Sequence, residues 1–381
     1  MFKSTFDFWI NSLKLLEDLY ITIAIFSFLI LIIYYSYFFL KLFLHKDKTS
    51  SFDSPISIII CAKNEFQNLK NNLPLILSQN YCEFEVIVVN DHSNDDSSFY
   101  LEEMSQKNKN LVVVDLNDSV ADTLGKKFAL TLGIKTAKYE HILLTDADCI
   151  PNSKNWVKMM SSNFVNSEII IGYGSYRKTK GFLNKFIRFD TFQVAQQYLS
   201  FALAGYPYMG VGRNLAYKKS LFFDNKGFAT HLHIPSGDDD LFIQEIVSKS
   251  TISIEISDNS HTTSEVLDNW QSWIYQKRRH LSTSSMYKNQ FKILLTIYPL
   301  AQFMFFMCIL ILFILKIDLS IAIFLLVIKL SLSYILNYRI MKRLNVNDLY
   351  FFHPIYEILH LILQIFFVFL NINDKPKQWN K

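Results

Sequence analysis

Four apolar stretches, one near the start of this 381-residue chain and three near its end, constrain its fold more than any other feature. The first, residues 19–40, carries no charged side chain, and at about 1.5 Å per residue it is roughly 33 Å long, enough to cross a bilayer core. It ends in tyrosine and phenylalanine rather than small residues, which favours a retained membrane helix over a cleaved signal peptide. With 50% hydrophobic residues, the chain is predicted to be anchored in a membrane, not disordered or fibrous.

The three C-terminal stretches cover residues 293–315, 319–335 and 350–370. Lys329 interrupts the second, and polar residues such as Glu357 and His360 occur in the third, so a position at the membrane surface or against its neighbours is the alternative for the third. We expect four spans. The predicted order is an interfacial segment at residues 1–18, a transmembrane helix at 19–40, a soluble domain at 51–290, and a C-terminal transmembrane region of about three hydrophobic segments at 293–370.

Basic residues on both sides of the soluble middle predict which side of the membrane it faces, because cytoplasmic loops are enriched in lysine and arginine. They follow the first stretch at Lys41, Lys46 and Lys48, and precede the second at Arg278, Arg279, Lys288 and Lys292. We therefore expect a multi-pass protein of the cell membrane with a cytoplasmic middle domain. Arg339, Lys342 and Arg343 agree, whereas Lys375, Lys377 and Lys381 disagree if the last stretch crosses fully.

Charge and cysteine content exclude other classes of protein. The net charge of +4, without a basic stripe in the soluble middle, argues against nucleic acid as a partner. The four cysteines have no CxxC spacing and indicate neither a disulfide framework nor a structural zinc site: Cys61, Cys82, Cys149 and Cys308. Free thiols suit a cytoplasmic domain.

Short apolar runs alternate with helix-like stretches in the soluble middle. Buried strands are predicted at residues 56–60, 84–89, 111–114 and 141–144, with helices at 68–78 and 97–106 between the first three. This alternation predicts an α/β fold whose mostly parallel sheet is covered on both faces.

Polar residues follow three of these strands: Lys63, Asn64 and Glu65 after the first, Asp91 and His92 after the second, and Asp146 and Asp148 after the fourth. Since ligands bind beyond the carboxyl ends of strands in open α/β sheets, we expect these residues to converge on one site. No Gly-rich phosphate loop follows the first strand, which argues against a dinucleotide oxidoreductase and a P-loop enzyme.

Several of these residues allow a functional and a structural interpretation. Asp146 and Asp148 could hold a divalent cation that also binds two phosphates, or form an acidic turn. Asp91 could accept hydrogen bonds from a base or ribose, or form an Asx-turn and helix cap. Lys126 and Lys127, at the start of a predicted helix, could help hold an anion or form a solvated pair.

Two charged groups lie farther along the chain. The first is a run of three aspartates just before the apolar run 241–247: Asp238, Asp239 and Asp240. Carboxylates so close together raise the pKa of at least one of them, which suits a general base. A helix cap explains the three aspartates equally well. The second group consists of Gln276, Arg278, Arg279 and His280. Its arginines could contact a diphosphate. Alternatively, these residues are simply the basic residues expected on the cytoplasmic side of a membrane helix.

Taken in order, these motifs resemble the series found in membrane-bound family 2 glycosyltransferases with a GT-A fold. The similarity covers roughly residues 51–290 and rests on the segments 58–65, 89–95, 125–130, 145–149, 210–217, 237–241 and 276–280. Order and spacing carry the resemblance, because each motif alone is weak. The resemblance implies inverting transfer of a sugar from a nucleoside-diphosphate donor, usually with Mg²⁺ or Mn²⁺.

Single positions follow from this resemblance. Glu65 and Asp91 match donor-nucleoside contacts, Lys126 matches the lysine of a GK motif, and Asp146 and Asp148 match the motif for metal and diphosphate. The base is Asp238 if Leu241 aligns with the leucine of an EDxDL pattern, and Asp239 if residues 237–239 are a GDD motif; we prefer Asp238. Gln276 and Arg279 match a QxxRW motif, in which His280 replaces the tryptophan and puts long-chain processive synthesis in doubt.

The resulting hypothesis is an inverting glycosyltransferase that moves one sugar to a lipid-linked or glycan acceptor at the cytoplasmic membrane face. Asp238 would take the proton from the acceptor oxygen, which displaces the diphosphate directly. A processive polysaccharide synthase and a catalytically inactive membrane scaffold are the alternatives, and the intact acidic motifs argue against the scaffold.

Overall fold

Four apolar runs of the middle segment form neighbouring parallel strands, as predicted. The computed structural model describes residues 2–47, 50–116, 125–234, 236–247 and 250–373. Each strand starts at the predicted residue and runs two residues farther than predicted: β1 (Ile56–Ala62), β2 (Phe84–Asp91), β3 (Leu111–Leu116) and β4 (His141–Asp146). The extra residues bring Asp91 and Asp146 into the sheet itself.

The main sheet has seven strands in the order β3-β2-β1-β4-β8-β6-β9. It gains β6 (Ile169–Ile171), β8 (Leu215–Lys218) and β9 (Ile252–Ile254), and all neighbours are parallel except the two pairs that β8 makes. A small second sheet consists of β5 (Cys149–Pro151), β10 (Thr262–Ser264) and β7 (Gly174–Tyr176). The predicted mostly parallel α/β fold is confirmed.

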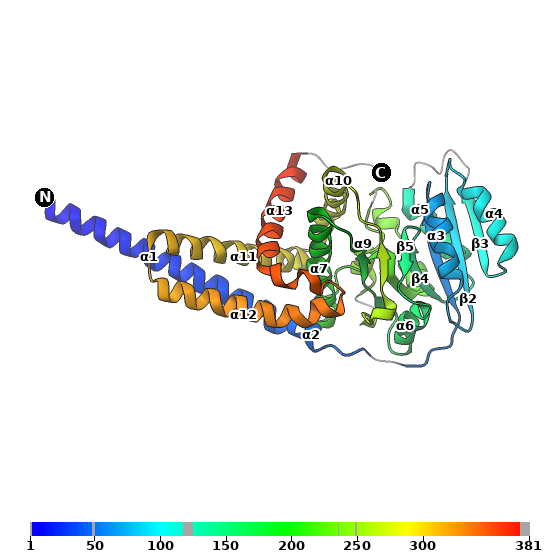
Figure 1. The fold of residues 1–381 in the computed structure, drawn as a ribbon, viewed down its shortest axis with the longest axis horizontal. Helices are drawn as coiled ribbons and strands as arrows, with labels where there is room; N and C mark the ends of the chain where they lie inside the picture. Colours follow the sequence, from blue (N-terminus) through cyan, green and yellow to red (C-terminus); the bar gives the residue numbers. More distant parts are fainter. Residues whose placement is uncertain (1, 48–49, 117–124, 235, 248–249, 374–381) are drawn as a thin grey trace.

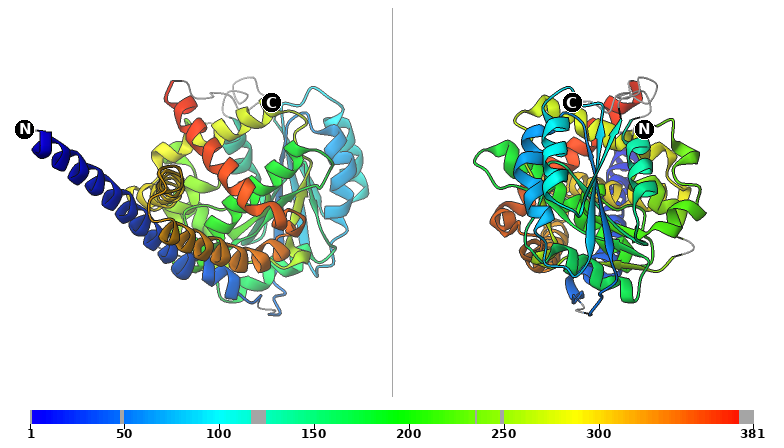
Figure 2. Two further views of the ribbon diagram at one scale, coloured as in Figure 1. Left: turned by 60° about the vertical axis from the view of Figure 1, so that its left-hand side comes forward. Right: turned by 90° about the vertical axis from the view of Figure 1, so that its right-hand side faces the viewer.

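Helices cover both faces of the main sheet (Figure 2). Side chains of β1 alternate between two cores: Ile56, Ile58 and Ile60 pack with α3 (Phe66–Leu77), α4 (Ser97–Lys107) and α6 (Trp156–Ser162). On the other face, Ile59 and Cys61 pack with α5 (Gly125–Thr136), α7 (Phe182–Leu203) and α9 (Asp240–Ile246). Burial on both faces explains why the central runs of β1, β2 and β4 are mostly apolar.

Shorter helices connect these elements. They are η3 (Asn163–Val165), η4 (Gly212–Asn214), α8 (Lys219–Asp224), η5 (Ala229–His231), η7 (Asp258–Ser260), α10 (Trp270–Leu281) and η8 (Ser282–Met286). Of these, η4 lies against β4, and η8 lies against α9 and α10.

Four helical segments are long and apolar enough to cross a membrane: Lys14–Leu44, Asn289–Leu315, Leu319–Arg343 and Asn347–Leu370. The first combines α1 (Phe2–Ile33), the π-helical turn η1 (Tyr34–Phe39) and α2 (Leu40–Leu44) in one continuous helix. The others are α11 (Asn289–Leu315), α12 (Leu319–Arg343) and, after η9 (Asn347–Phe352), α13 (His353–Asn373). The first helix starts well before residue 19, so an interfacial position of residues 1–18 stays a prediction.

The long helices do not all run in the same direction. In Figure 1, α1, α11 and α12 form a bundle that projects from the α/β domain, whereas α13 runs across the end of that bundle next to α7 and α10. Lys329 of α12, which interrupts an apolar stretch, is fully buried and bonds to Glu357 of α13 at 2.5 Å. Gln302 of α11 donates to the same carboxylate at 2.6 Å, so the three polar groups satisfy one another.

Candidate active site

The carboxyl ends of β1, β2 and β4 meet at one edge of the sheet because the three strands are parallel and paired in register. Cys61 of β1 lies opposite Asp146 of β4, and Ala62 lies opposite Asn90 of β2. The loops that follow these strands are therefore neighbours, as the sequence predicted. Asn64 joins two of the loops, since its amide N–H donates to Ser93 at 2.9 Å and its side chain accepts from the N–H of Asn94 at 2.7 Å.

The ammonium group of Lys126 lies between two carboxylates that are far apart in the sequence. Its Nζ is 2.8 Å from Oδ1 of Asp146 and 3.3 Å from Oδ2 of Asp238. Lys126 comes from the first turn of α5, Asp146 from the end of β4, and Asp238 from the turn before α9. The structure thus brings three of the predicted site residues into direct contact, and the solvated-lysine alternative is wrong for Lys126.

Charge and burial perturb this cluster. Burial alone would lower the pKa of Lys126, but the carboxylates of Asp146 and Asp238 outweigh it and raise that pKa well above its usual value. Burial would raise the pKa of Asp238, but the Lys126 ammonium lowers it. Both groups are therefore charged at neutral pH.

The three consecutive aspartates have different partners. Oδ1 of Asp239 accepts from the N–H of Asp240 at the start of α9, and its Oδ2 accepts from the N–H of Gly212 at 2.9 Å. Burial, followed by the neighbouring charges of Asp238 and Asp240, raises the pKa of Asp239 to about 7. The sequence allowed these aspartates to be either a helix cap or part of an acidic site. Both occur: Asp239 caps α9, and Asp238 belongs to the cluster around Lys126.

Asp240 points away from the Lys126 cluster toward the start of the membrane region. Its Oδ2 accepts hydrogen bonds from Thr283 at 2.5 Å and Tyr287 at 2.7 Å, and its side chain is almost fully buried. Thr283 and Tyr287 were not predicted as partners of this aspartate. A buried aspartate requires a partner, but nothing in the sequence indicated that it would lie more than 40 residues away.

Asp146 and Asp148 have the geometry and chemistry for a divalent cation. Their carboxylate oxygens and Sγ of Cys149 lie within 4.8 Å of one another, and both aspartates are partly exposed. Cys149 is buried, contacts Ser264 Oγ at 3.0 Å, and has a pKa raised well above its usual value by burial, so it remains a thiol. Two oxygen ligands with solvent access fit Mg²⁺ or Mn²⁺ and leave positions for phosphate oxygens.

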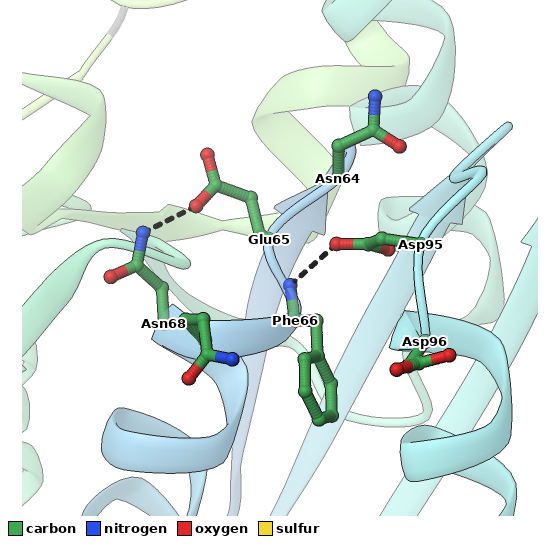
Figure 3. A pocket seen from close by; sticks show the side chains of 7 residues that line it. Asn64, Glu65, Phe66, Asn68, Asp95 and Asp96 are labelled. Carbon is green, nitrogen blue, oxygen red and sulfur yellow. Dashed lines mark hydrogen bonds between the residues drawn. The ribbon is translucent and has the colours of Figure 1, made fainter.

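Glu65 lines an open pocket of about 340 Å³ between the loop after β1 and the loop after β2 (Figure 3). Asn68 donates to its carboxylate at 2.5 Å, and Asp95 on the opposite wall accepts from the N–H of Phe66 at 2.9 Å. Lys126, Asp146 and Asp238 are not among the residues that line this pocket. Glu65 thus lies at the same sheet edge as the cluster, in a pocket that those three residues do not line.

Asp91 is buried at the end of β2, and its Oδ1 lies 2.7 Å from Nδ1 of His92. His92 has a φ of 53°, a left-handed conformation that is uncommon outside glycine. This backbone turn brings the imidazole back onto the aspartate that precedes it. The Asx-turn alternative applies to Asp95, whose Oδ1 accepts from the N–H of Ser97 at 3.1 Å just before α4.

The residues on α10 lie beside the second sheet. Gln276 accepts a hydrogen bond from Tyr176 of β7 at 3.4 Å, and Arg279 lies 3.4 Å from Nε2 of His280. Asp238 and Arg213 are both within electrostatic range of His280, so this helix borders the acidic cluster. No direct contact between Gln276 and the Lys126 cluster is found in the part of the chain that the structure describes.

Residues 57–223 match the family described as Glycosyl transferase family 2. A poly-beta-1,6-N-acetyl-D-glucosamine synthase from Staphylococcus epidermidis is 36% identical over 95 residues, which are 25% of this chain and 22% of that protein. An uncharacterized glycosyltransferase from Haemophilus influenzae is 29% identical over 121 residues, which are 32% of this chain and 36% of that protein. The aligned part thus spans about a fifth to a third of these relatives.

Among solved structures, the chain is similar to a mannosyltransferase from Pyrobaculum calidifontis in complex with GDP-Man and Mn²⁺. The two have a TM-score of 0.54 and 16% sequence identity, over 89% of this chain and 98% of the other. At this identity the similarity concerns the fold, and it agrees with a GT-A-like α/β domain.

Proposed function

We propose that this chain, which carries a glycosyl transferase family 2 domain, transfers a sugar from a nucleoside-diphosphate donor to an acceptor at the membrane surface, with inversion at the anomeric carbon. The observation that carries the proposal is the meeting of Asp146, Lys126 and Asp238 at the carboxyl edge of the sheet. A lysine and carboxylates at such an edge can bind a charged leaving group on one side and a hydroxyl nucleophile on the other. The proposed acceptor is lipid-linked or a glycan, and the proposed location is the cytoplasmic face.

Asp146 and Asp148 are the proposed ligands of Mg²⁺ or Mn²⁺. When bound, the cation would neutralise negative charge on the diphosphate. Lys126 adds a second positive charge at the same place, because its ammonium already lies 2.8 Å from Asp146. We expect this ammonium to bind the diphosphate oxygens when the donor is present, which would free Asp238 from its ion pair.

Asp238 is the proposed general base. Its carboxylate is ionised beside Lys126, whose ammonium lies 3.3 Å from Oδ2 of Asp238. Asp239 has a pKa closer to neutral, but both of its oxygens accept backbone N–H groups, one from Gly212 and one from Asp240. We prefer Asp238 because a general base must be able to reach the acceptor hydroxyl. Its position therefore counts for more than how close its pKa is to neutral.

The remaining predicted residues have proposed roles at the edges of the site. Glu65 and Asp91 would contact the nucleoside, which fits the pocket that Glu65 lines next to the loop after β2. Gln276 and Arg279 would contact the diphosphate or the acceptor from α10, which borders the cluster through His280. These assignments come from the resemblance and from the placement of each loop.

A processive polysaccharide synthase is the second candidate, and the similarity to a protein named as a polymer synthase favours it. His280 in place of the usual tryptophan favours transfer of a single sugar instead. The length of the product made by the purified full chain separates the two: one added sugar supports a single transfer, and a ladder of long products supports processive synthesis.

The primary test is a screen of UDP- and GDP-sugars, with N-acetylglucosamine and mannose included, for Mn²⁺-dependent stabilisation and hydrolysis by the full chain in detergent. Asp238→Asn should bind the donor as the parent does but lose transfer by roughly 10²- to 10⁴-fold, because the proton acceptor is removed. Asp224→Asn, at an exposed position on α8, is the matched control and should keep full activity. A parent protein that binds no nucleotide sugar with metal would instead identify an inactive scaffold, and full activity of Asp238→Asn would refute the assigned base.

A further inference from the structure

Helix α13 separates its polar and apolar residues onto different faces. His353, Glu357, His360 and Gln364 recur every three or four residues along one face, which is the spacing of a helix stripe. The opposite face is exposed and apolar: Ile355, Ile358, Ile362, Phe366 and Phe369. Such a helix has one surface suited to protein and another suited to lipid.

The polar face of α13 contacts both the bundle and the α/β domain: His353 and Glu357 bond to α12, and residues farther along the helix pack on α7 and α10. Tyr356 stacks on Phe189 of α7 with ring centroids 5.3 Å apart, and Phe367, three turns later, contacts Trp273 of α10 at 5.7 Å. The carbonyl of Leu370 accepts a hydrogen bond from Arg278 of α10 at 3.4 Å. The far end of α13 is thus as close to the α/β domain as its beginning.

An ion-pair cluster fixes the middle of α13 to both domain helices. Asp190 of α7 is buried, lies 2.6 Å from Nζ of Lys277 on α10, and lies 3.2 Å from Nε2 of His360 on α13. If α13 crossed the bilayer in this arrangement, α10 with Lys277 and Arg278 would be drawn into the hydrocarbon core, where charged groups are strongly disfavoured.

We propose that α13 lies in the membrane surface on the side of the α/β domain and does not cross, with the lipid bilayer as the partner of its exposed apolar face. Of the four candidate spans in the described residues, α1, α11 and α12 then cross the membrane. This count places the C-terminus on the same side as the α/β domain, and Lys375, Lys377 and Lys381 then follow the positive-inside rule. Figure 1 agrees, because α13 runs across the end of the three-helix bundle, not along it.

Thiol labelling in sealed right-side-out vesicles tests the side of the C-terminus. Cys82 is the exposed native cysteine, while Cys61, Cys149 and Cys308 are buried, so Cys82→Ser gives a background for single reporters. Lys316→Cys, in the turn between α11 and α12, should react with an impermeant maleimide in sealed vesicles. Lys377→Cys should react only after permeabilisation, as Cys82 does in the parent; reaction of Lys377→Cys in sealed vesicles would overturn the proposal.

The depth of α13 gives a second, independent readout. Spin labels at Ile362→Cys, midway along α13, and at Val327→Cys, midway along the apolar stretch of α12, form a matched pair of exposed apolar positions. In bilayers, an interfacial α13 makes the label at 362 much more accessible to a water-soluble nickel reagent than the label at 327. Equal depth at the two sites would show that α13 spans. Neither test depends on the proposed transfer reaction.

Discussion

Replacement of Lys126 by methionine tests the charge balance of the site. With an effective dielectric constant of ~20, unit charges at the observed 2.8 and 3.3 Å attract by about 6 and about 5 kcal/mol. Desolvation offsets much of this attraction, and the Asp146 side chain is 34% exposed, so we expect a net loss of about 2 kcal/mol. For a domain of this size, that loss corresponds to a melting temperature lower by about 4–8 °C.

The assay is thermal unfolding of the full chain in detergent at pH 7, with and without Mn²⁺. Without metal, Lys126→Met should have a lower melting temperature than the parent. Mn²⁺ should raise the melting temperature of Lys126→Met more than that of the parent, because the cation supplies the missing positive charge. Lys135→Met, at an exposed position on the same helix, should change neither value. Equal melting temperatures of Lys126→Met and the parent, together with equal responses to Mn²⁺, would refute the argument.

The pH dependence of this difference has a defined sign. Because the folded protein lowers the pKa of Asp238, its ion pair contributes stability that is fully present above the unfolded pKa of about 4. That contribution is lost as the pH falls through the lower, folded pKa. The melting temperatures of Lys126→Met and the parent should therefore converge below about pH 4, and a gap that stays constant at lower pH would contradict the assignment.

Four other substitutions have defined outcomes in the same unfolding assay. Lys329→Met and Glu357→Gln should each destabilise by about 3–5 kcal/mol by leaving a buried charge unpaired, and the double variant should be less destabilised than the sum of the two. Gly172→Ala should cost about 1–3 kcal/mol, because its Cβ would lie 2.6 Å from the Asn214 side chain; a neutral effect would show that this contact is not rigid. Tyr287→Phe removes a hydrogen bond to a buried carboxylate and should cost about 1.5–3 kcal/mol.

The sequence predicted the first four strands, β1 to β4, well because their apolar runs are short, rich in β-branched residues and bounded by polar loops, whereas β6, β8 and β9 of the same sheet were not predicted. Strands that are buried on both faces show a continuous apolar run instead of alternating polar and apolar residues, so their starts are easy to recognise. The start residue of each of these four strands was predicted correctly. The two residues missed at the carboxyl ends of β2 and β4 are polar: Asn90 and Asp91, and Thr145 and Asp146. The apolar pattern stops before these polar residues, whereas the backbone pairing of the strands continues through them.

The site was predicted as a set of residues but not as a set of contacts. Lys126 and Lys127 are adjacent in sequence, yet Lys126 bonds to Asp146, while Lys127 is buried and donates to the carbonyl of His231 at 2.7 Å. Successive side chains of a helix point about 100° apart, so one faces the site and the other faces a loop packed on α5. Without knowledge of how that loop folds, the sequence offered no way to separate their roles.

The segment of three aspartates links the site to the membrane. Asp238 contacts Lys126, whereas Asp240 accepts a hydrogen bond from Tyr287, two residues before α11 begins at Asn289. The amide of Lys288 also donates to Gln244 of α9 at 3.0 Å. Because the proposed base and the first residue of a candidate span are joined through one short helix, their separation is fixed by the fold. If Asp238 is the base and α11 enters the bilayer, as proposed, the acceptor hydroxyl would react near the bilayer surface, where a lipid-linked acceptor would present it.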